Sequence, residues 1–186
     1  MALYPSTQRS ATYVPAQYYP GDIVGGRTAV NLGTNGYFAL GDLTVGYGCF
    51  LADSGNQVSV VRANAGTTAP VAGIVPRNQG MAPMSFDETL IGWSQKVADG
   101  MQATVVARGD LAVVVTGVDN TGAADHDPTI GETIFVSETD GSLACSTSAT
   151  VTGYVASTFK VTKNTLFSES VTLGTNQLGC LISSNI

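Results

Sequence analysis

Charge is scarce in this 186-residue sequence, because Asp, Glu, Lys and Arg together make up only 12% of it. Typical soluble proteins carry about 25% charged residues, and coiled coils need still more Glu, Lys and Arg, so that class is excluded. The chain has eight Lys and Arg and 14 Asp and Glu, which gives a net charge of −6. Phosphate binding needs clustered basic side chains, and the eight basic residues are scattered along the sequence, which argues against a nucleic-acid partner.

Long apolar runs are missing as well. No stretch of about 18 apolar residues occurs, so we expect no membrane-spanning helix and no membrane partner. The first 20 residues contain no apolar segment of the kind that a secretory signal needs. Hydrophobic residues still make up 44% of the chain, which is enough to build a core and excludes a disordered protein. The length predicts one domain.

Cysteine is present only three times, as Cys49, Cys145 and Cys180. The number is odd and no two cysteines have metal-ligand spacing, so neither a disulfide framework nor a zinc motif is indicated. Their apolar sequence surroundings predict buried thiols that pack as small hydrophobic side chains. We therefore expect the chain to fold in a reducing compartment.

Histidine occurs once, as His126 between Asp125 and Asp127, a pattern that predicts an exposed loop. No GxSxG nucleophile motif accompanies it. Together with Asp119, the two flanking aspartates lack the spacing of an EF-hand, so we interpret all three as solvated turn residues. We expect no enzyme activity, no catalytic residue, no metal ligand and no cofactor, although whether the Asp119–Asp127 loop binds an ion stays open.

Short runs of Val, Ile, Thr and aromatic residues, separated by turn signals such as Asn-Gly and Asp-Gly, recur after residue 25. This pattern predicts strands rather than helices. The expected strands are Gly36–Leu40, Thr44–Leu51, Gln57–Ala63, Val71–Val75, Leu90–Val97, Gln102–Ala107, Leu111–Val118, Thr133–Glu138, Gly153–Lys163, Thr165–Leu173 and Gln177–Ser183.

The apolar run from Leu111 to Val115 predicts a strand covered on both faces. Strand spacing near 8–12 residues and the absence of a sustained helical period indicate an all-β fold, a jelly-roll-like β-sandwich or a barrel. We expect residues 26–186 to form this single β domain.

The N-terminal 25 residues differ from the rest. Residues 1–21 contain no Asp or Glu, and they hold four of the seven tyrosines as well as three prolines. Prolines at this spacing favour extended backbone, and tyrosine offers a large contact area at low entropic cost. We therefore expect residues 1–25 to be an extended arm that binds a partner. The predicted interface residues are Tyr4, Arg9, Tyr13, Tyr18 and Tyr19.

Three collinear stretches resemble the structural cement proteins, or capsid decoration proteins, of tailed bacteriophages. The first is VGYGCFLAD at 45–53, and the second is GIVPRNQ at 73–79. The third runs from Val97-Ala98-Asp99-Gly100 to Gly109-Asp110-Leu111-Ala112-Val113. The hairpin pattern at 131–141 also corresponds, so the resemblance covers roughly residues 40–145.

This resemblance implies a structural virion protein that binds the outer surface of a capsid shell. It further implies contact with the major capsid protein, bridging of neighbouring capsid subunits, and assembly as a homo-oligomer, a dimer or a trimer. No catalytic residue is implied. The implied location is the capsid exterior, after synthesis in the host cytoplasm.

Two other functions stay open at this point. Phage tail, baseplate and head-fibre-base components use similar β modules, and they would differ from a decoration protein in where they sit on the particle. A carbohydrate-binding β-sandwich would need an exposed aromatic platform. The only tryptophan is Trp93, and Ile91 on the same face of its predicted strand favours a core position for it.

Overall fold

The computed structural model describes part of the chain. The described residues are 18, 20–24, 29–31, 37–52, 60–65, 69–77, 96–164 and 173–184. Every regular element among them is a strand, which confirms the predicted all-β class. Within these ranges the chain has no helix that is long and apolar enough to cross a membrane.

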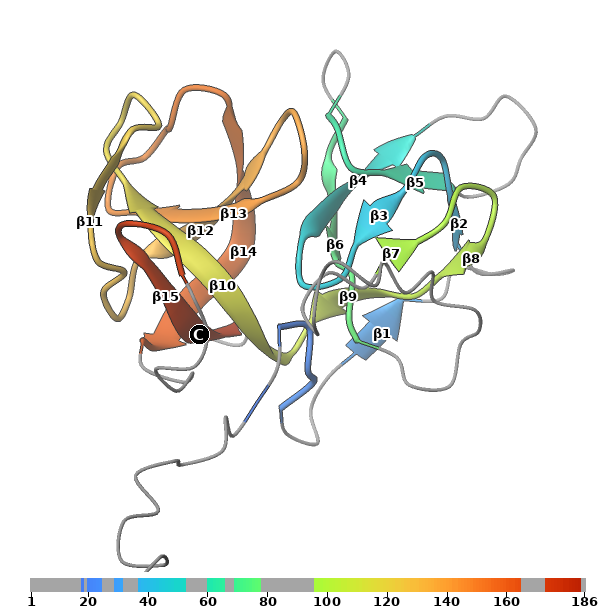
Figure 1. The fold of residues 1–186 in the computed structure, drawn as a ribbon, viewed down its shortest axis with the longest axis horizontal. Helices are drawn as coiled ribbons and strands as arrows, with labels where there is room; N and C mark the ends of the chain where they lie inside the picture. Colours follow the sequence, from blue (N-terminus) through green and yellow to red (C-terminus); the bar gives the residue numbers. More distant parts are fainter. Residues whose placement is uncertain are drawn as a thin grey trace, which may run out of the picture.

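The first half of the chain forms a seven-stranded sheet in the order β1-β9-β6-β4-β5-β2-β8 (Figure 1). A separate pair, β3 (Leu43–Thr44) and β7 (Lys96–Val97), lies beside it. The strands of the large sheet are β1 (Ala29–Asn31), β2 (Tyr37–Ala39), β4 (Gly48–Ala52), β5 (Val60–Arg62), β6 (Val71–Ile74), β8 (Gln102–Ala103) and β9 (Val105–Arg108).

The second half forms a six-stranded sheet in the order β11-β10-β13-β12-β14-β15. Because β15 also pairs with β10, five of these strands close into a barrel and β11 stays outside the ring. Closure leaves no unpaired edge within the ring. The strands are β10 (Asp110–Val118), β11 (Ala124–His126), β12 (Thr133–Ser137), β13 (Leu143–Ser146), β14 (Tyr154–Lys163) and β15 (Gln177–Ser183).

Both halves contribute to one hydrophobic core. Phe50 of β4 and Ile74 of β6 belong to the same buried cluster as Val113 of β10 and Val136 of β12. The halves also approach closely at Gly48, where an added Cβ would lie only 2.4 Å from a methyl carbon of Val136. The single domain expected for residues 26–186 stays a prediction.

The predicted strands agree best with the structure in the barrel. β15 has the predicted bounds, β12 and β14 each differ by one residue at one end, and all but one residue from Leu111 to Val115 is fully buried. The expected strand Thr44–Leu51 is instead divided between β3 and β4 by a turn in which Gly46 has a φ of 82°. Similarly, Gln102–Ala107 is divided between β8 and β9.

Three strands, β1, β11 and β13, were not predicted. The predictions for Leu90–Val97 and Thr165–Leu173 fall mostly outside the described residues, as does Trp93. Only Lys96–Val97 of the former is seen as a strand.

The end of the N-terminal segment contacts the barrel. Gly21 donates a backbone hydrogen bond to Ala112 of β10 at 2.7 Å, and Ala112 in turn donates to Asp22 at 2.9 Å. Gly21 is buried, and a Cβ there would lie 2.6 Å from a methyl carbon of Val45, so only glycine is accommodated. Residues 20–24 therefore lie along β10 even though the sequence placed them in the arm.

Candidate functional site

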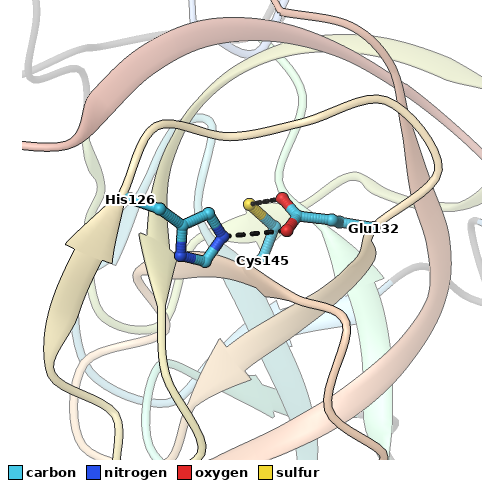
Figure 2. A group of neighbouring side chains, drawn as sticks. All are labelled: His126, Glu132 and Cys145. Atoms are coloured by element: carbon cyan, nitrogen blue, oxygen red, sulfur yellow. Dashed lines mark hydrogen bonds and ion pairs between the residues drawn. The ribbon is translucent and has the colours of Figure 1, made fainter.

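A cluster of three polar side chains lies at the outer edge of the barrel, between β11, β12 and β13 (Figure 2). His126 is the last residue of β11, Glu132 directly precedes β12, and Cys145 is in β13. The Nε2 atom of His126 lies 2.8 Å from one carboxylate oxygen of Glu132, and the Cys145 thiol donates to the other oxygen at 2.9 Å. One buried carboxylate thus connects two other strands.

The sheet register places these side chains together. His126 pairs with Gly117 of β10, and Gly117 pairs on its other side with Cys145, so the three residues form one row across the sheet. Paired residues project on the same face. A Cβ at Gly117 would lie 2.0 Å from the His126 carbonyl oxygen and 3.0 Å from the Cδ2 atom of its ring. Glycine in the middle of the row therefore allows the imidazole to approach β10.

Glu132 is held by the loop that precedes it. Its residue is only 4% exposed, and its second carboxylate oxygen also accepts a hydrogen bond from the Thr129 backbone N–H at 2.8 Å. The Gly131 N–H donates to the Val161 carbonyl at 2.8 Å, and the Val161 N–H donates to the Glu132 carbonyl at 3.0 Å. A buried carboxylate is costly unless it is paired and hydrogen-bonded, and here both oxygens have partners.

The neighbouring groups settle the charges of the cluster. Hydrogen bonding to Asp125, and then to Glu132, raises the pKa of His126 despite its partial burial. Burial alone would raise the pKa of Glu132, but hydrogen bonds from Cys145, Thr129 and His126 outweigh it and lower the value. Burial, followed by the hydrogen bond to Glu132, raises the pKa of Cys145. These shifts favour the protonated imidazole, the carboxylate and the neutral thiol over their other protonation states.

These charges decide what the cluster can do chemically. A thiol with a raised pKa is a poor nucleophile, because the thiolate is the reactive form. Cys49 and Cys180 are likewise buried and free, and burial raises the pKa of each to about 12. The prediction of buried thiols is confirmed, and Cys145 serves as a hydrogen-bond donor to Glu132.

The structure corrects the sequence prediction for His126. The residue lies in a strand rather than on an exposed loop, because β11 pairs with β10 and the ring turns inward to Glu132. Asp125 is bonded to the other ring nitrogen of His126. Asp119 instead accepts hydrogen bonds within its own turn, from Thr121 and from the Ala123 N–H, as expected of a turn residue.

The roles of Glu132 and Cys145 were missed by the sequence analysis. Cys145 stands among small residues and Glu132 in an ordinary turn, and neither position carries a recognised ligand motif. Their contact with His126 depends on two strand pairings between distant segments. The sequence analysis interpreted Asp125, next to His126, only as a solvated turn residue.

The predicted arm residues are mostly outside the described part of the chain, including Tyr4, Arg9, Tyr13 and Tyr19. Tyr18 is described and is half-buried. Among the described residues, five large hydrophobic side chains are exposed instead. They are Ile23, Leu40, Leu51, Met101 and Ile130.

The pH dependence of stability tests the cluster in metal-free protein. The raised pKa of His126 gives a stabilisation that is complete below its ordinary value of 6.5 and is lost as pH rises through the folded value. The lowered pKa of Glu132 gives a stabilisation that is complete above pH 4.5, the ordinary pKa of the group, and that is lost as the pH falls through the pKa of the folded state. Both groups therefore stabilise the folded protein fully between about pH 4.5 and 6.5. Asp125 and Cys145 are the other titratable groups near the imidazole ring.

We therefore expect chelator-treated protein to lose about 1 kcal/mol or less of unfolding free energy between pH 6 and 8, since His126 is partly solvent-screened. Urea titrations across this range measure the loss. The His126→Gln variant should not show it. An equal pH dependence in that variant would show that His126 is not the titrating group.

The fold and the cluster together define an all-β barrel protein in which a partly exposed histidine of the outer strand contacts a buried carboxylate. The sequence from 7 to 176 matches the model of a family described as structural cement protein (E217 gp24/Pam3 gp6). The chain therefore belongs to this family of phage structural proteins, which are associated with the virion capsid, and the resemblance noted in the sequence is confirmed. No curated protein matches the sequence.

Proposed function

We propose that the protein binds the outer surface of a phage capsid shell and bridges neighbouring major capsid subunits, without catalysing a reaction. The family match over residues 7–176 is the observation that carries this proposal. A bridging protein also needs at least two separated contact surfaces. The exposed apolar side chains of the described residues offer one in each half of the molecule.

The first surface is the tip formed by Leu40 and Met101, which follow β2 and precede β8 at one end of the molecule (Figure 1). Leu40 is 50% exposed and Met101 is 41% exposed. The two turns are bound to each other, because the Ala39 N–H donates to the Met101 carbonyl at 2.9 Å and the Gly41 N–H donates to Asp99 at 2.7 Å. The tip therefore presents two apolar side chains on preformed turns that also carry the exposed Asp42 and Asp99.

The second surface is Ile130, the most exposed large hydrophobic residue described, at 67%. It lies in the loop from β11 to β12, and these strands belong to the half opposite the tip (Figure 1). The Glu132 carboxylate fixes this loop. It accepts a hydrogen bond from the backbone N–H of Thr129, next to Ile130, and it contacts the ring of His126 at the start of the loop. An apolar residue on a fixed loop loses little entropy on binding.

Two modest contacts are enough for firm attachment. Full burial of a Leu, Ile or Met side chain contributes about 1.5–3 kcal/mol, which is weak for a single contact. When both contacts are made by one molecule, the second is intramolecular and the apparent affinity rises by orders of magnitude. Assembly as a dimer or a trimer would multiply the contacts again. Low charge also suits this role, because interface cores are depleted in charged residues.

Substitution of each surface separately tests the bridging arrangement. We expect a Leu40→Ser/Met101→Ser variant and an Ile130→Ser variant each to reduce the number of copies bound to undecorated shells at least about tenfold, because each removes one arm of a bivalent attachment. Copies per shell are counted by quantitative gel analysis of sedimented particles.

Thr150→Ala serves as the matched control and should bind fully, because Thr150 is exposed between β13 and β14 and belongs to neither surface. The unfolding free energy of all three variants should equal that of the unchanged protein. Full decoration by a variant that lacks both apolar surfaces would contradict the proposed contacts. Attachment at the tail vertex alone would favour a tail or baseplate component.

A further inference from the structure

We propose that His126, Glu132 and Cys145 form a binding site for one Zn²⁺ ion. The candidate ligand atoms are a ring nitrogen, a carboxylate oxygen and a sulfur, and all of them lie within 4.8 Å of one another. They come from β11, the start of β12, and β13, so they converge through the fold and not through a local sequence motif. This inference does not depend on the proposed capsid contacts.

The chemistry of the donor set selects the class of ion. Zinc is bound in proteins by thiolate, imidazole and carboxylate groups, at about 2.0–2.3 Å, with three protein ligands and a water in open sites. Calcium and magnesium prefer oxygen ligands, and the sulfur of Cys145 disfavours both. A mixed sulfur, nitrogen and oxygen set therefore points to a borderline-soft divalent ion such as Zn²⁺.

Groups behind the three ligands already orient them. Asp125 is bonded to Nδ1 of His126, which leaves Nε2 as the atom that faces Glu132. Metal-binding histidines usually have such a carboxylate on the other nitrogen. The Thr129 N–H donates to the Glu132 carboxylate at 2.8 Å and fixes its orientation in the same way.

The burial of the site matches a three-ligand centre with one open position. Glu132 and Cys145 are buried, whereas the His126 side chain is 34% exposed. An ion and its water ligand can therefore enter from the side of the histidine. Gly117 lies between His126 and Cys145 in the sheet and places no side chain between them.

Binding exchanges protons for the ion without a change in the charge of the cluster. Without metal, the thiol S–H and the imidazole N–H donate to Glu132. When Zn²⁺ enters, both protons leave to solvent, and thiolate sulfur and neutral imidazole nitrogen coordinate the ion together with the carboxylate. Protonated imidazole, thiol and carboxylate sum to zero, and so do Zn²⁺, thiolate, imidazole and carboxylate.

Titration of the metal-stripped full-length protein with zinc chloride tests this site. Native mass spectrometry should find one zinc per chain, and Co²⁺ in its place should give the near-ultraviolet absorption of a thiolate–cobalt bond. We expect Cys145→Ala and His126→Gln each to weaken zinc binding at least about 100-fold. Asp125→Asn should weaken it about 10–100-fold, as loss of an orienting partner typically does.

Cys49→Ala is the matched control, because Cys49 is also buried but its thiol donates to the Gly73 carbonyl in the other half of the molecule. This variant should bind one zinc with unchanged affinity. Because Cys145→Ala removes a buried group, the partly exposed His126→Gln variant and urea unfolding of each protein show whether lost binding reflects lost folding.

Two results would overturn the proposal. One is the absence of stoichiometric zinc binding to the unchanged folded protein. The other is equal zinc binding by the Cys145→Ala and Cys49→Ala variants. Either would leave the cluster as a hydrogen-bond network only.

Discussion

Replacing Val113 with aspartate is expected to abolish folding. Val113 is fully buried at the middle of β10, where it pairs with Cys180 of β15 and belongs to the core cluster shared by both halves. An isolated carboxylate in such a position costs several kcal/mol or more. A domain of this kind has only about 5–15 kcal/mol of stability in total, so the substitution removes most or all of it.

Soluble expression, far-ultraviolet circular dichroism and urea unfolding measure this result. Thr158→Asp is the matched control, because Thr158 is an exposed position of β14 in the same barrel. That variant should unfold at nearly the same urea concentration as the unchanged protein. If Val113→Asp is instead soluble and unfolds like the control, Val113 does not lie in the core, which would contradict the position of β10 in this fold.

Deleting residues 1–17 is expected to leave stability nearly unchanged while it strongly reduces capsid decoration. The deletion removes Tyr4, Arg9 and Tyr13 of the predicted interface. It retains Pro20–Val24, whose backbone is bonded to β10 and therefore contributes to the fold. Each docked tyrosine contributes roughly 1–3 kcal/mol when fully buried, so the loss of two lowers occupancy by orders of magnitude.

The measurement is paired: urea unfolding of the truncated protein, and its copy number on undecorated shells. A Tyr4→Ser/Tyr13→Ser variant of the full chain separates the loss of anchors from the loss of length, and it should also decorate poorly. A truncated protein that unfolds easily but decorates fully would show that the arm belongs to the core of its own domain.

The barrel strands could be predicted from sequence where they are rich in β-branched residues. Leu111–Val115 and Tyr154–Lys163 carry this signal, and the structure places both in the barrel. β13 was missed because Leu143–Ser146 consists mainly of small residues with little preference for strands. β13 is buried because it lies between β10 and β12 in the sheet. The local sequence of β13 does not indicate this position.

The polar cluster could not be predicted for a related reason. Glu132 and Cys145 are 13 positions apart, and His126 reaches them only because β10 lies between β11 and β13. The parallel pairing of β10 with β13 brings Gly117 beside Cys145. A sequence shows which side chains could bind one another, but the pairing of strands that are far apart in the sequence decides which of them come into contact.

Imaging of undecorated shells by electron cryo-microscopy, before and after incubation with this protein, tests the proposed function most directly. We expect added density on the outer surface at every equivalent position, with each copy in contact with two neighbouring capsid subunits. Density on the inner surface, density at a single vertex, or copies that contact only one subunit would contradict the proposal that the protein bridges and stabilises the shell from outside.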